Sequence, residues 1–237
     1  MGTVRGDVVD AIRRELEKVG DPDRAKNHQA YMKSTMPFRG ISAPQLKATL
    51  RPLLADPAYV LTGLDEWEAT IHGLWDTARF REERYAAVAI CRHRLYRSWA
   101  QNPCAMPVYR HLVESGAWWD FVDDIASHRV GPVLRAHPET ESDRMRSWAV
   151  ADSMWLRRAA ILSQLSSREE TDRHLLLDCI TANLGDNEFF IRKAIGWSLR
   201  QYARSGTTAA DWVRRNVEEL GPRLSPLSRR EALKHLG

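Results

Sequence analysis

The sequence predicts an all-α protein, folded as an α-solenoid of helical repeats. Segments with the alternating, β-branched pattern of sheet strands are scarce, and Gly or Pro interrupts the helical pattern every 12 to 20 residues. Two helices in about 35 to 40 residues are typical of HEAT or armadillo repeats. An aromatic residue recurs early in successive helices at separations of 39, 36 and 35 residues, namely Phe80, Trp119, Trp155 and Phe190. An irregular helical bundle is the alternative that this period leaves open.

Two of these repeats also align residue for residue. The segments "MWLRRAAIL" and "FFIRKAIGW" share an aromatic residue, an aliphatic one, two basic ones and an alanine in the same order. We therefore expect about twelve or thirteen helices in a single domain over residues 1–237, with one helix of each pair lining a concave groove.

The composition is that of a globular protein. Of the 237 residues, 43% are hydrophobic and 28% are charged, and no run of about 18 apolar residues predicts a membrane span. The first residues, "MGTVRGDVVDAIRREL", have the pattern of a helix rather than of a secretory signal. Three widely spaced cysteines without a CxxC pair indicate a reduced, cytoplasmic protein and argue against a disulfide framework or a cysteine zinc site.

Basic charge is concentrated near the C-terminus. Residues 189–237 hold ten Lys/Arg and four Asp/Glu, a net charge of +6, whereas the whole chain has a net charge of +4. A basic segment on a near-neutral body favours a polyanionic partner. Solubility alone is the competing explanation for this bias.

The segment "GAWWDFVDDIA", residues 116–126, has the pattern of the front half of a helix. At about 100° per residue, an apolar core stripe is formed by Trp118, Phe121, Val122 and Ile125. Trp119 lies off this stripe and one turn from Asp123, at the spacing where helical side chains are neighbours. An indole beside a carboxylate, away from the core, is the first indication of a functional site.

The segment "SMWLRRAAILSQL" places a charge inside an apolar stripe. Arg158 points between Leu162 and Leu165, and a guanidinium in this position requires a partner because burying an unpaired charge is costly. An internal salt bridge and a contact with a bound anion are both consistent with this pattern.

The segment "NEFFIRKAIGWSLRQYAR" has a second indole away from the core. Its apolar side consists of Ile191, Ala194, Ile195, Leu199 and Tyr202, and the opposite side consists of Lys193, Trp197, Arg200 and Arg204. Gly196 in mid-helix costs about 1 kcal/mol relative to alanine, and a broken local rule beside an exposed aromatic often marks a functional surface. The alternative is that Trp197 packs on a neighbouring repeat and the cations form a solvated face.

Capping residues mark two helix starts near the C-terminus. Asp186 or Asn187 is a suitable N-cap in "GDNEFF". In "SPLSRREALKHLG" the residues Ser228 and Glu231 have capping-box spacing.

These residue types together suit glycosidic cleavage in DNA. Cations bind phosphates, and indoles offer flat apolar surfaces to sugars or bases. A carboxylate suits a reaction that develops positive charge, as glycosidic cleavage does in its oxocarbenium-like transition state. A cationic alkylated purine is already a good leaving group, so no general acid is needed to protonate it.

Four ordered motifs resemble those of the AlkD-type DNA alkylation repair family, HEAT-like-repeat DNA glycosylases that remove N3- and N7-alkylated purines. The motifs are "AWWDFVD", "MWLRRAAIL", "EFFIRKAIGW" with "LRQYA", and "LSPLSRREALKH", and the N-terminal "YMKSTMPFRGISAP" is similar to the family's first repeat. The resemblance covers nearly the whole chain and is strongest from Trp118 to His235. It implies the solenoid rather than the bundle, with a positively charged concave groove that binds DNA.

The resemblance also implies roles for individual residues. The family's catalytic carboxylate falls on Asp123, and its two cleft tryptophans fall on Trp119 and Trp197. The positions that match the family's DNA-contacting surface are Tyr31, Arg158, Lys193, Arg200, Arg229 and Arg230.

The implied enzyme hydrolyses the N-glycosidic bond of cationic alkylpurines in double-stranded DNA and leaves the lesion in the duplex rather than flipping it into a pocket. We expect a monomer that uses no cofactor. No metal is expected either, since the eight histidines form no HExxH motif. Asp120 and Asp124 are expected to turn toward solvent. A DNA-binding relative without catalytic activity and a HEAT-repeat protein scaffold are the competing functions.

Overall fold

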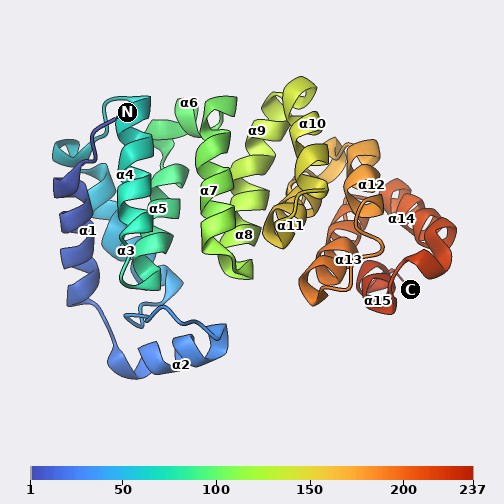
Figure 1. Cartoon of the computed structure of the whole chain (residues 1–237), viewed down its shortest axis with the longest axis horizontal. Coiled ribbons are helices and arrows are strands. Elements are labelled where there is room, and N and C mark those ends of the chain that lie inside the picture. The colour runs from blue at the N-terminus through green and yellow to red at the C-terminus, as the bar shows by residue number, and fades with distance from the viewer. Residues whose placement is uncertain (1, 237) are drawn as a thin grey trace. The chain divides into compact units, whose positions relative to one another are not determined.

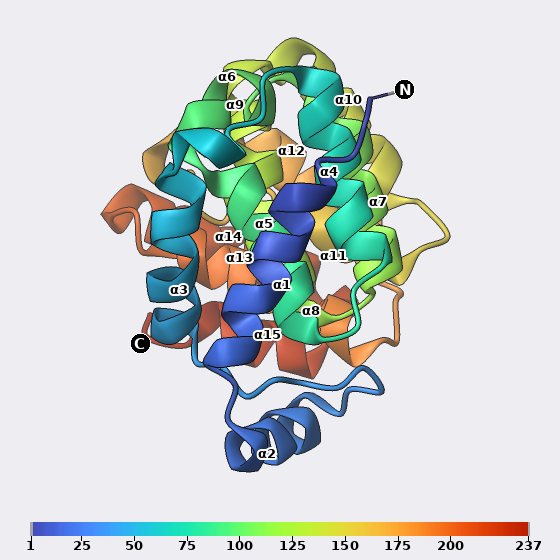
Figure 2. The same ribbon diagram turned by 90° about the vertical axis from the view of Figure 1, so that its left-hand side faces the viewer.

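The structure is a computed structural model that describes residues 2–236, and these residues form helices and loops (Figure 1 and Figure 2). The α-helices run from α1 to α15, and no strand occurs in this part of the chain. When α8, the π-helical turn after it and α9 are counted as one helix, and the four-residue α6 is left out, thirteen helices remain among the described residues. The predicted all-α fold is confirmed, and helices adjacent in the chain pack on one another as in an α-solenoid. Within residues 2–236 no helix is long and apolar enough to cross a membrane.

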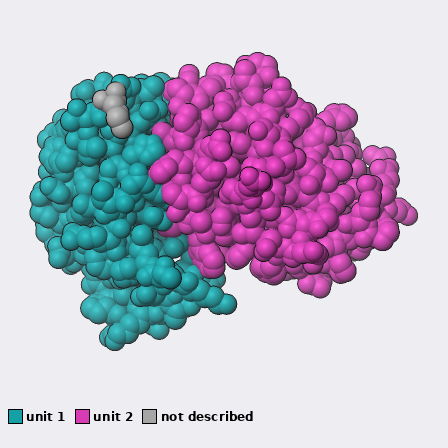
Figure 3. Space-filling view, in the orientation of Figure 1, with its two compact units in different colours: residues 1–100 teal, residues 101–237 magenta. Residues whose placement is uncertain are grey.

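The chain forms two compact units, residues 1–100 and residues 101–237 (Figure 3). Each unit buries an apolar core of its own. That residues 1–237 act as one domain stays a prediction.

Unit 1 has its core between α1, α3, α4 and α5. Its helices are α1 (Gly6–Lys18), α2 (Pro22–Met32), α3 (Ala43–Ala55), η1 (Pro57–Tyr59), α4 (Leu64–Asp76), α5 (Arg81–Arg92), η2 (Arg94–Tyr96) and α6 (Arg97–Ala100). Core side chains without any exposure include Ile12, Leu16, Trp67, Ile71, Leu74 and Trp75.

Helix α2 lies apart from the other helices of unit 1 in both ribbon views, and Met32 is its single buried residue (Figure 1 and Figure 2). The loop that follows α2 is fixed to α5 by the buried carboxylate of Glu82, which accepts hydrogen bonds of 2.9–3.1 Å from the backbone N–H groups of residues 39–41. Gly40, with φ 80°, packs so closely on α2 that a Cβ atom there would lie 2.1 Å from the carbonyl oxygen of Asp21. Polar contacts with this loop, rather than a large apolar face, therefore hold α2.

Unit 2 carries the predicted chemistry. Its helices are η3 (Pro103–Ala105), α7 (Met106–Gly116), α8 (Trp119–Ile125), η4 (Ala126–Val130), α9 (Gly131–Ala136), α10 (Pro138–Ala149), α11 (Met154–Leu162), η5 (Arg168–Glu170), α12 (Arg173–Thr181), α13 (Phe189–Ala203), α14 (Thr207–Leu220), η6 (Gly221–Arg223) and α15 (Pro226–Leu233). Helix α11 packs on α7, α8, α10 and α13, and α13 in turn packs on α14 and α15. Fully buried core residues include Leu112, Val122, Ile125, Met145, Ile161, Ile191 and Leu199.

The N-caps of the two helices predicted near the C-terminus differ from the predicted ones. For α13 the prediction was wrong, because the N-cap is Glu188; Asp186 lies two residues earlier and accepts the N–H of Glu188 at 2.8 Å. For α15 it was also wrong, because the N-cap is Ser225 rather than Ser228, and Ser225 accepts the N–H of Ser228 at 3.0 Å. Pro226 then occupies the first helical position, where its missing N–H is no loss.

Candidate active site

The carboxylate of Asp123 and the guanidinium of Arg158 form a two-point ion pair between α8 and α11. Nε of Arg158 donates to Oδ1 of Asp123 at 2.7 Å, and Nη2 donates to Oδ2 at 2.8 Å. The side chains of Asp123 and Arg158 are 14% and 4% exposed, so the pair is largely removed from water. Of the two interpretations that the sequence left open for Arg158, the internal salt bridge is confirmed, and its partner is the predicted catalytic carboxylate.

Three helices fix the position of this pair. Arg158 follows the first turn of α11, where the hydroxyl of Ser153 accepts the N–H of Leu156 and caps the helix. The remaining guanidinium nitrogen of Arg158, Nη1, donates to the backbone carbonyl of Phe190 in the first turn of α13. All three nitrogens of the guanidinium are thus engaged, and the orientation of Asp123 does not depend on a bound ligand.

Burial raises the pKa of Asp123 above its ordinary value, because the charged carboxylate is removed from water. The hydrogen bonds and the charge of Arg158 act in the opposite direction, and the carboxylate of Asp120 raises the pKa further. A carboxylate with a raised pKa is a stronger proton acceptor once it is ionised. Asp123 is therefore an oriented carboxylate whose basicity is raised by burial.

A surface hollow of about 340 Å³ lies beside Asp123. Its lining comes from α8, η4, the segment after α11 and α13, and consists of Asp123, Asp124, Ser127, His128, Leu165, Ser166, Trp197 and Gln201. The predicted carboxylate and one predicted indole therefore share a single concavity. Asp124, expected to turn toward solvent, is instead half-buried in this lining, and Asp120 is half-buried as well.

Trp119 is the first residue of α8 and is half-buried, one turn before Asp123 as predicted. It is not among the residues that line the hollow. The structure thus brings Asp123, Arg158 and Trp197 to one place and leaves Trp119 at the beginning of the same helix.

The tryptophan that continues the aromatic repeat is Trp118 rather than Trp119. The ring centroid of Trp118 lies 6.0 Å from that of Trp155 and 5.6 Å from that of Phe190, and the latter two are 5.1 Å apart. Trp118 is the N-cap residue of α8 and is half-buried within this cluster, whereas the other three members of the predicted core stripe are buried. The guanidinium of Arg158 lies 5.7 Å from the centroid of the Phe190 ring, so this aromatic cluster also packs against the ion pair.

A π-helical turn follows Asp123, and the sequence analysis did not predict it. Helix α8 passes through η4 into α9 without a break, and the hydroxyl of Ser127 donates to the carbonyl oxygen of Asp123 at 2.6 Å. In a π-turn the backbone hydrogen bonds join residues five apart rather than four. Ser127 and His128 follow Asp123 and Asp124 by four residues, and all four line the hollow. Turns of the π type often occur at functional sites.

Lys193 and Arg200 lie on α13, and both are paired with Glu231 of α15. Nζ of Lys193 lies 2.7 Å from one carboxylate oxygen of Glu231, and Nη1 of Arg200 contacts the other. The hydrogen bond from Lys193, followed by that from Arg200, lowers the pKa of Glu231 to about 2, so this carboxylate is ionised at neutral pH. Sequence reasoning identified the two cations and missed the anion between them.

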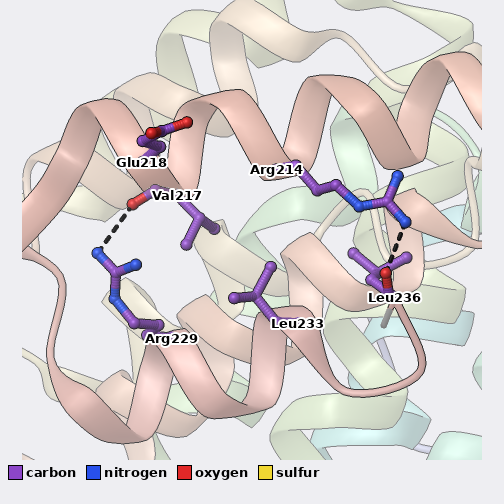
Figure 4. A pocket seen from close by; sticks show the side chains of 6 residues that line it. All are labelled: Arg214, Val217, Glu218, Arg229, Leu233 and Leu236. Atoms are coloured by element: carbon purple, nitrogen blue, oxygen red, sulfur yellow. Dashed lines mark hydrogen bonds between the residues drawn. The ribbon is translucent and has the colours of Figure 1, made fainter.

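The remaining predicted DNA contacts differ in their surroundings. Arg230 is exposed on α15, whereas Nη2 of Arg229 donates to the carbonyl oxygens of Val217 and Gly221 at 3.1 Å each, and the first of these contacts appears in Figure 4. Arg229 thereby satisfies carbonyl groups at the C-terminus of α14. In unit 1, Tyr31 is 77% exposed near the end of α2.

Fold and site together define a helical-repeat protein with a buried, oriented carboxylate beside a hollow that an indole lines. The chain matches the family model described as DNA alkylation repair enzyme over residues 12–236, and it belongs to that family. It is similar to a structure described as a predicted DNA alkylation repair enzyme from Enterococcus faecalis, with a TM-score of 0.76, 31% sequence identity, and coverage of 92% of this chain and 97% of that one. No curated protein matches the chain.

Proposed function

We propose that the protein is a DNA glycosylase that hydrolyses the N-glycosidic bond of cationic N3- and N7-alkylated purines in duplex DNA, such as 3-methyladenine and 7-methylguanine. This activity would begin base excision repair of alkylation damage. The observation that carries the proposal is the carboxylate of Asp123, which Arg158 holds beside a hollow lined by Trp197. Membership of the DNA alkylation repair family supports the same conclusion.

In the proposed reaction the bond between the anomeric carbon and the purine nitrogen breaks, and its electron pair leaves with the base. An alkylated purine that carries a positive charge departs as a neutral base, so the protein needs no acid to protonate it. The sugar becomes cationic, and the negative charge of Asp123 stabilises it. Water then attacks the anomeric carbon, and the carboxylate, made more basic by burial, accepts a proton from it.

The two indoles are proposed to contact the deoxyribose of the damaged nucleotide. Trp197 lines the hollow beside Asp123, and Trp119 lies one turn before that carboxylate on α8. A sugar that faces this surface leaves its base in the duplex, so bulky N3 and N7 adducts are proposed as substrates along with methylated purines. The reaction uses side chains and water, and the proposed active form is a cytoplasmic monomer in which residues 1–237 form a single domain.

We assign DNA binding to cations other than Arg158, which is paired with Asp123. Lys193 and Arg200 are proposed to bind phosphates, with Arg230 and the exposed Tyr31 as further contacts. Arg158 is almost fully buried against Asp123, so its proposed role is to orient the carboxylate rather than to reach DNA.

A panel of duplexes that each contain one lesion tests the proposed function under single-turnover conditions. Small and bulky cationic N3- or N7-alkylpurines should both be released, whereas uracil, 1,N6-ethenoadenine and 8-oxoguanine should persist. Release of one of these uncharged lesions would require a general acid to protonate the departing base, and it would contradict the mechanism. Release of small but not bulky cationic bases would indicate a closed pocket with base flipping, and binding without any release would indicate a DNA-binding relative that lacks catalytic activity.

A further inference from the structure

Glu231 lies over the face of α13 that carries the two proposed phosphate-binding cations. Lys193 is three residues before Gly196 and Arg200 is four residues after it, so the three residues share one face of the helix. Glu231 contacts Lys193 with one carboxylate oxygen and Arg200 with the other. A single carboxylate therefore bridges two cations that lie about one turn to either side of a glycine.

Gly196 makes this close approach of α15 to α13 possible. A Cβ atom on Gly196 would lie 2.5 Å from Cβ of Glu231 and 2.6 Å from the carbonyl oxygen of Ser228, distances at which neighbouring atoms must move. Ser228 also donates its hydroxyl group to the carbonyl oxygen of Arg192 at 2.8 Å. The glycine, which is unfavourable in a helix interior, is thus explained by the packing that brings Glu231 between the cations.

Both cations keep donors for a further anion. An ammonium group has three N–H donors and a guanidinium has five. The carboxylate of Glu231 contacts the ammonium group of Lys193 and only Nη1 of the Arg200 guanidinium, which also donates to the backbone carbonyl of Glu231 at 3.3 Å. The side chains of Lys193 and Arg200 are 37% and 18% exposed, whereas that of Glu231 is 11% exposed. The cluster therefore presents its cations to solvent more than its carboxylate.

We infer that Glu231 is a positioning residue for DNA binding, which holds Lys193 and Arg200 ready for backbone phosphates on the helix that carries Trp197. This inference rests on the proposed function. Long basic side chains lose rotamer freedom when they bind, and fixing them beforehand reduces that loss. The alternative is that the carboxylate of Glu231 competes with DNA phosphates for Lys193 and Arg200 and so weakens DNA binding.

The substitution Glu231→Gln separates these roles by the sign of its effect. It removes a negative charge, so competition and general electrostatic attraction both predict tighter binding to DNA. Loss of positioning predicts binding about five- to tenfold weaker, because two long side chains must then be ordered during association. Binding is measured by fluorescence anisotropy with an undamaged duplex. Glu219→Gln on α14 is the matched control, since Glu219 is exposed and the charge change is the same; its affinity should stay equal or rise.

A double-mutant comparison separates positioning from a general effect on the fold. In a Lys193→Ala, Arg200→Ala background, Glu231→Gln should not weaken binding further, because the residues through which it acts are gone; as in the control, affinity should stay equal or rise. A loss by the same factor in both backgrounds would mean that Glu231 only supports α15, and it would overturn the inference. If the glutamine variant does not fold, Glu231→Asp keeps the net charge but is one methylene too short to bridge both cations, and it should also bind more weakly.

The possible failures are distinguishable. Tighter binding by Glu231→Gln, with a steeper dependence on salt, would overturn the positioning role and leave the glycosylase proposal intact. Absence of salt-dependent duplex binding by the unchanged protein would overturn the DNA-binding function and this inference with it.

Discussion

Replacing Asp123 by asparagine should affect both catalysis and stability, and the structure allows each effect to be worked out. Asparagine keeps the shape but removes the charge that opposes the oxocarbenium ion, and loss of one such group typically lowers the rate by about 10²- to 10³-fold. DNA affinity should change little, because Asp123 is not part of the cationic surface. The rate is measured as base release from a duplex with one 7-methylguanine, at enzyme concentrations that saturate the DNA.

The effect on stability follows from the buried ion pair. The sequence alone predicts a nearly intact fold for this variant, whereas the structure shows that the substitution leaves the guanidinium of Arg158 without its counter-charge at 4% exposure. Removing one partner of a buried pair costs about 3–5 kcal/mol. Asparagine still offers one acceptor oxygen, and Arg158 keeps its bond to the carbonyl of Phe190, so we expect a value near the lower end. For a chain of this size that corresponds to a melting temperature lower by about 6–12 °C.

A second variant separates the two effects. Replacing both partners, with Asp123→Leu and Arg158→Met, removes the charges together and should restore most of the stability, because apolar replacement of a buried pair is often neutral or stabilising. Excision should remain lost. If Asp123→Asn releases 7-methylguanine as fast as the unchanged protein, Asp123 has no part in the mechanism. If the double variant is fully active, the charge itself is not needed.

Three further predictions concern charge. Arg158→Met removes the group that opposes the raised pKa of Asp123, so the acid limb of the excision rate should move to higher pH; an unmoved limb would show that Asp123 does not govern it. Replacing both Lys193 and Arg200 by alanine should flatten the slope of log affinity against log salt by up to about two units, since each neutralised phosphate contributes about 0.9, and an unchanged slope would exclude both contacts. Glu231 has a pKa of about 2 in the folded protein, below its ordinary value of 4.5. The ionised carboxylate therefore stabilises the folded state, by at most about 3 kcal/mol, above pH 4.5, and this contribution should decline as the pH falls toward 2. The difference in unfolding free energy between the unchanged protein and Glu231→Gln should therefore shrink from pH 6 to pH 3, and a constant difference would contradict this assignment.

Helical periodicity predicted the buried side of α8 and α13, except that Trp118 and Tyr202 are half-buried. It placed Asp123 and Trp119 off the core of one helix, and Trp197 off the core of another, because the positions of apolar residues at 3.6-residue spacing depend only on the local sequence. It also showed that Arg158 needs a partner. It could not identify Asp123 as that partner, because helical periodicity carries no information about how one helix packs on another.

The features that sequence reasoning missed all depend on contacts between helices. Glu231 was read as part of a capping box, although its carboxylate pairs with cations on α13. The aromatic period was assigned to Trp119, although Trp118 packs against Trp155, because adjacent tryptophans fit a faint repeat equally well. Gly196 was interpreted as a sign of a functional surface. The structure shows instead that α15 packs closely on α13 at this glycine, a contact that the local sequence of α13 does not contain.

The measurement that tests the central claim most directly is abasic-site formation in a duplex that carries a single 7-methylguanine. The unchanged protein, in excess over DNA, should convert the lesion into an abasic site, seen as alkali-dependent strand cleavage at that position and nowhere else. Asp123→Asn, shown to be folded and to bind the same duplex, should do so about 10²- to 10³-fold more slowly. Binding of the duplex by the unchanged protein without abasic-site formation above the spontaneous rate would contradict the account, and would leave a DNA-binding member of the family that does not cut the glycosidic bond.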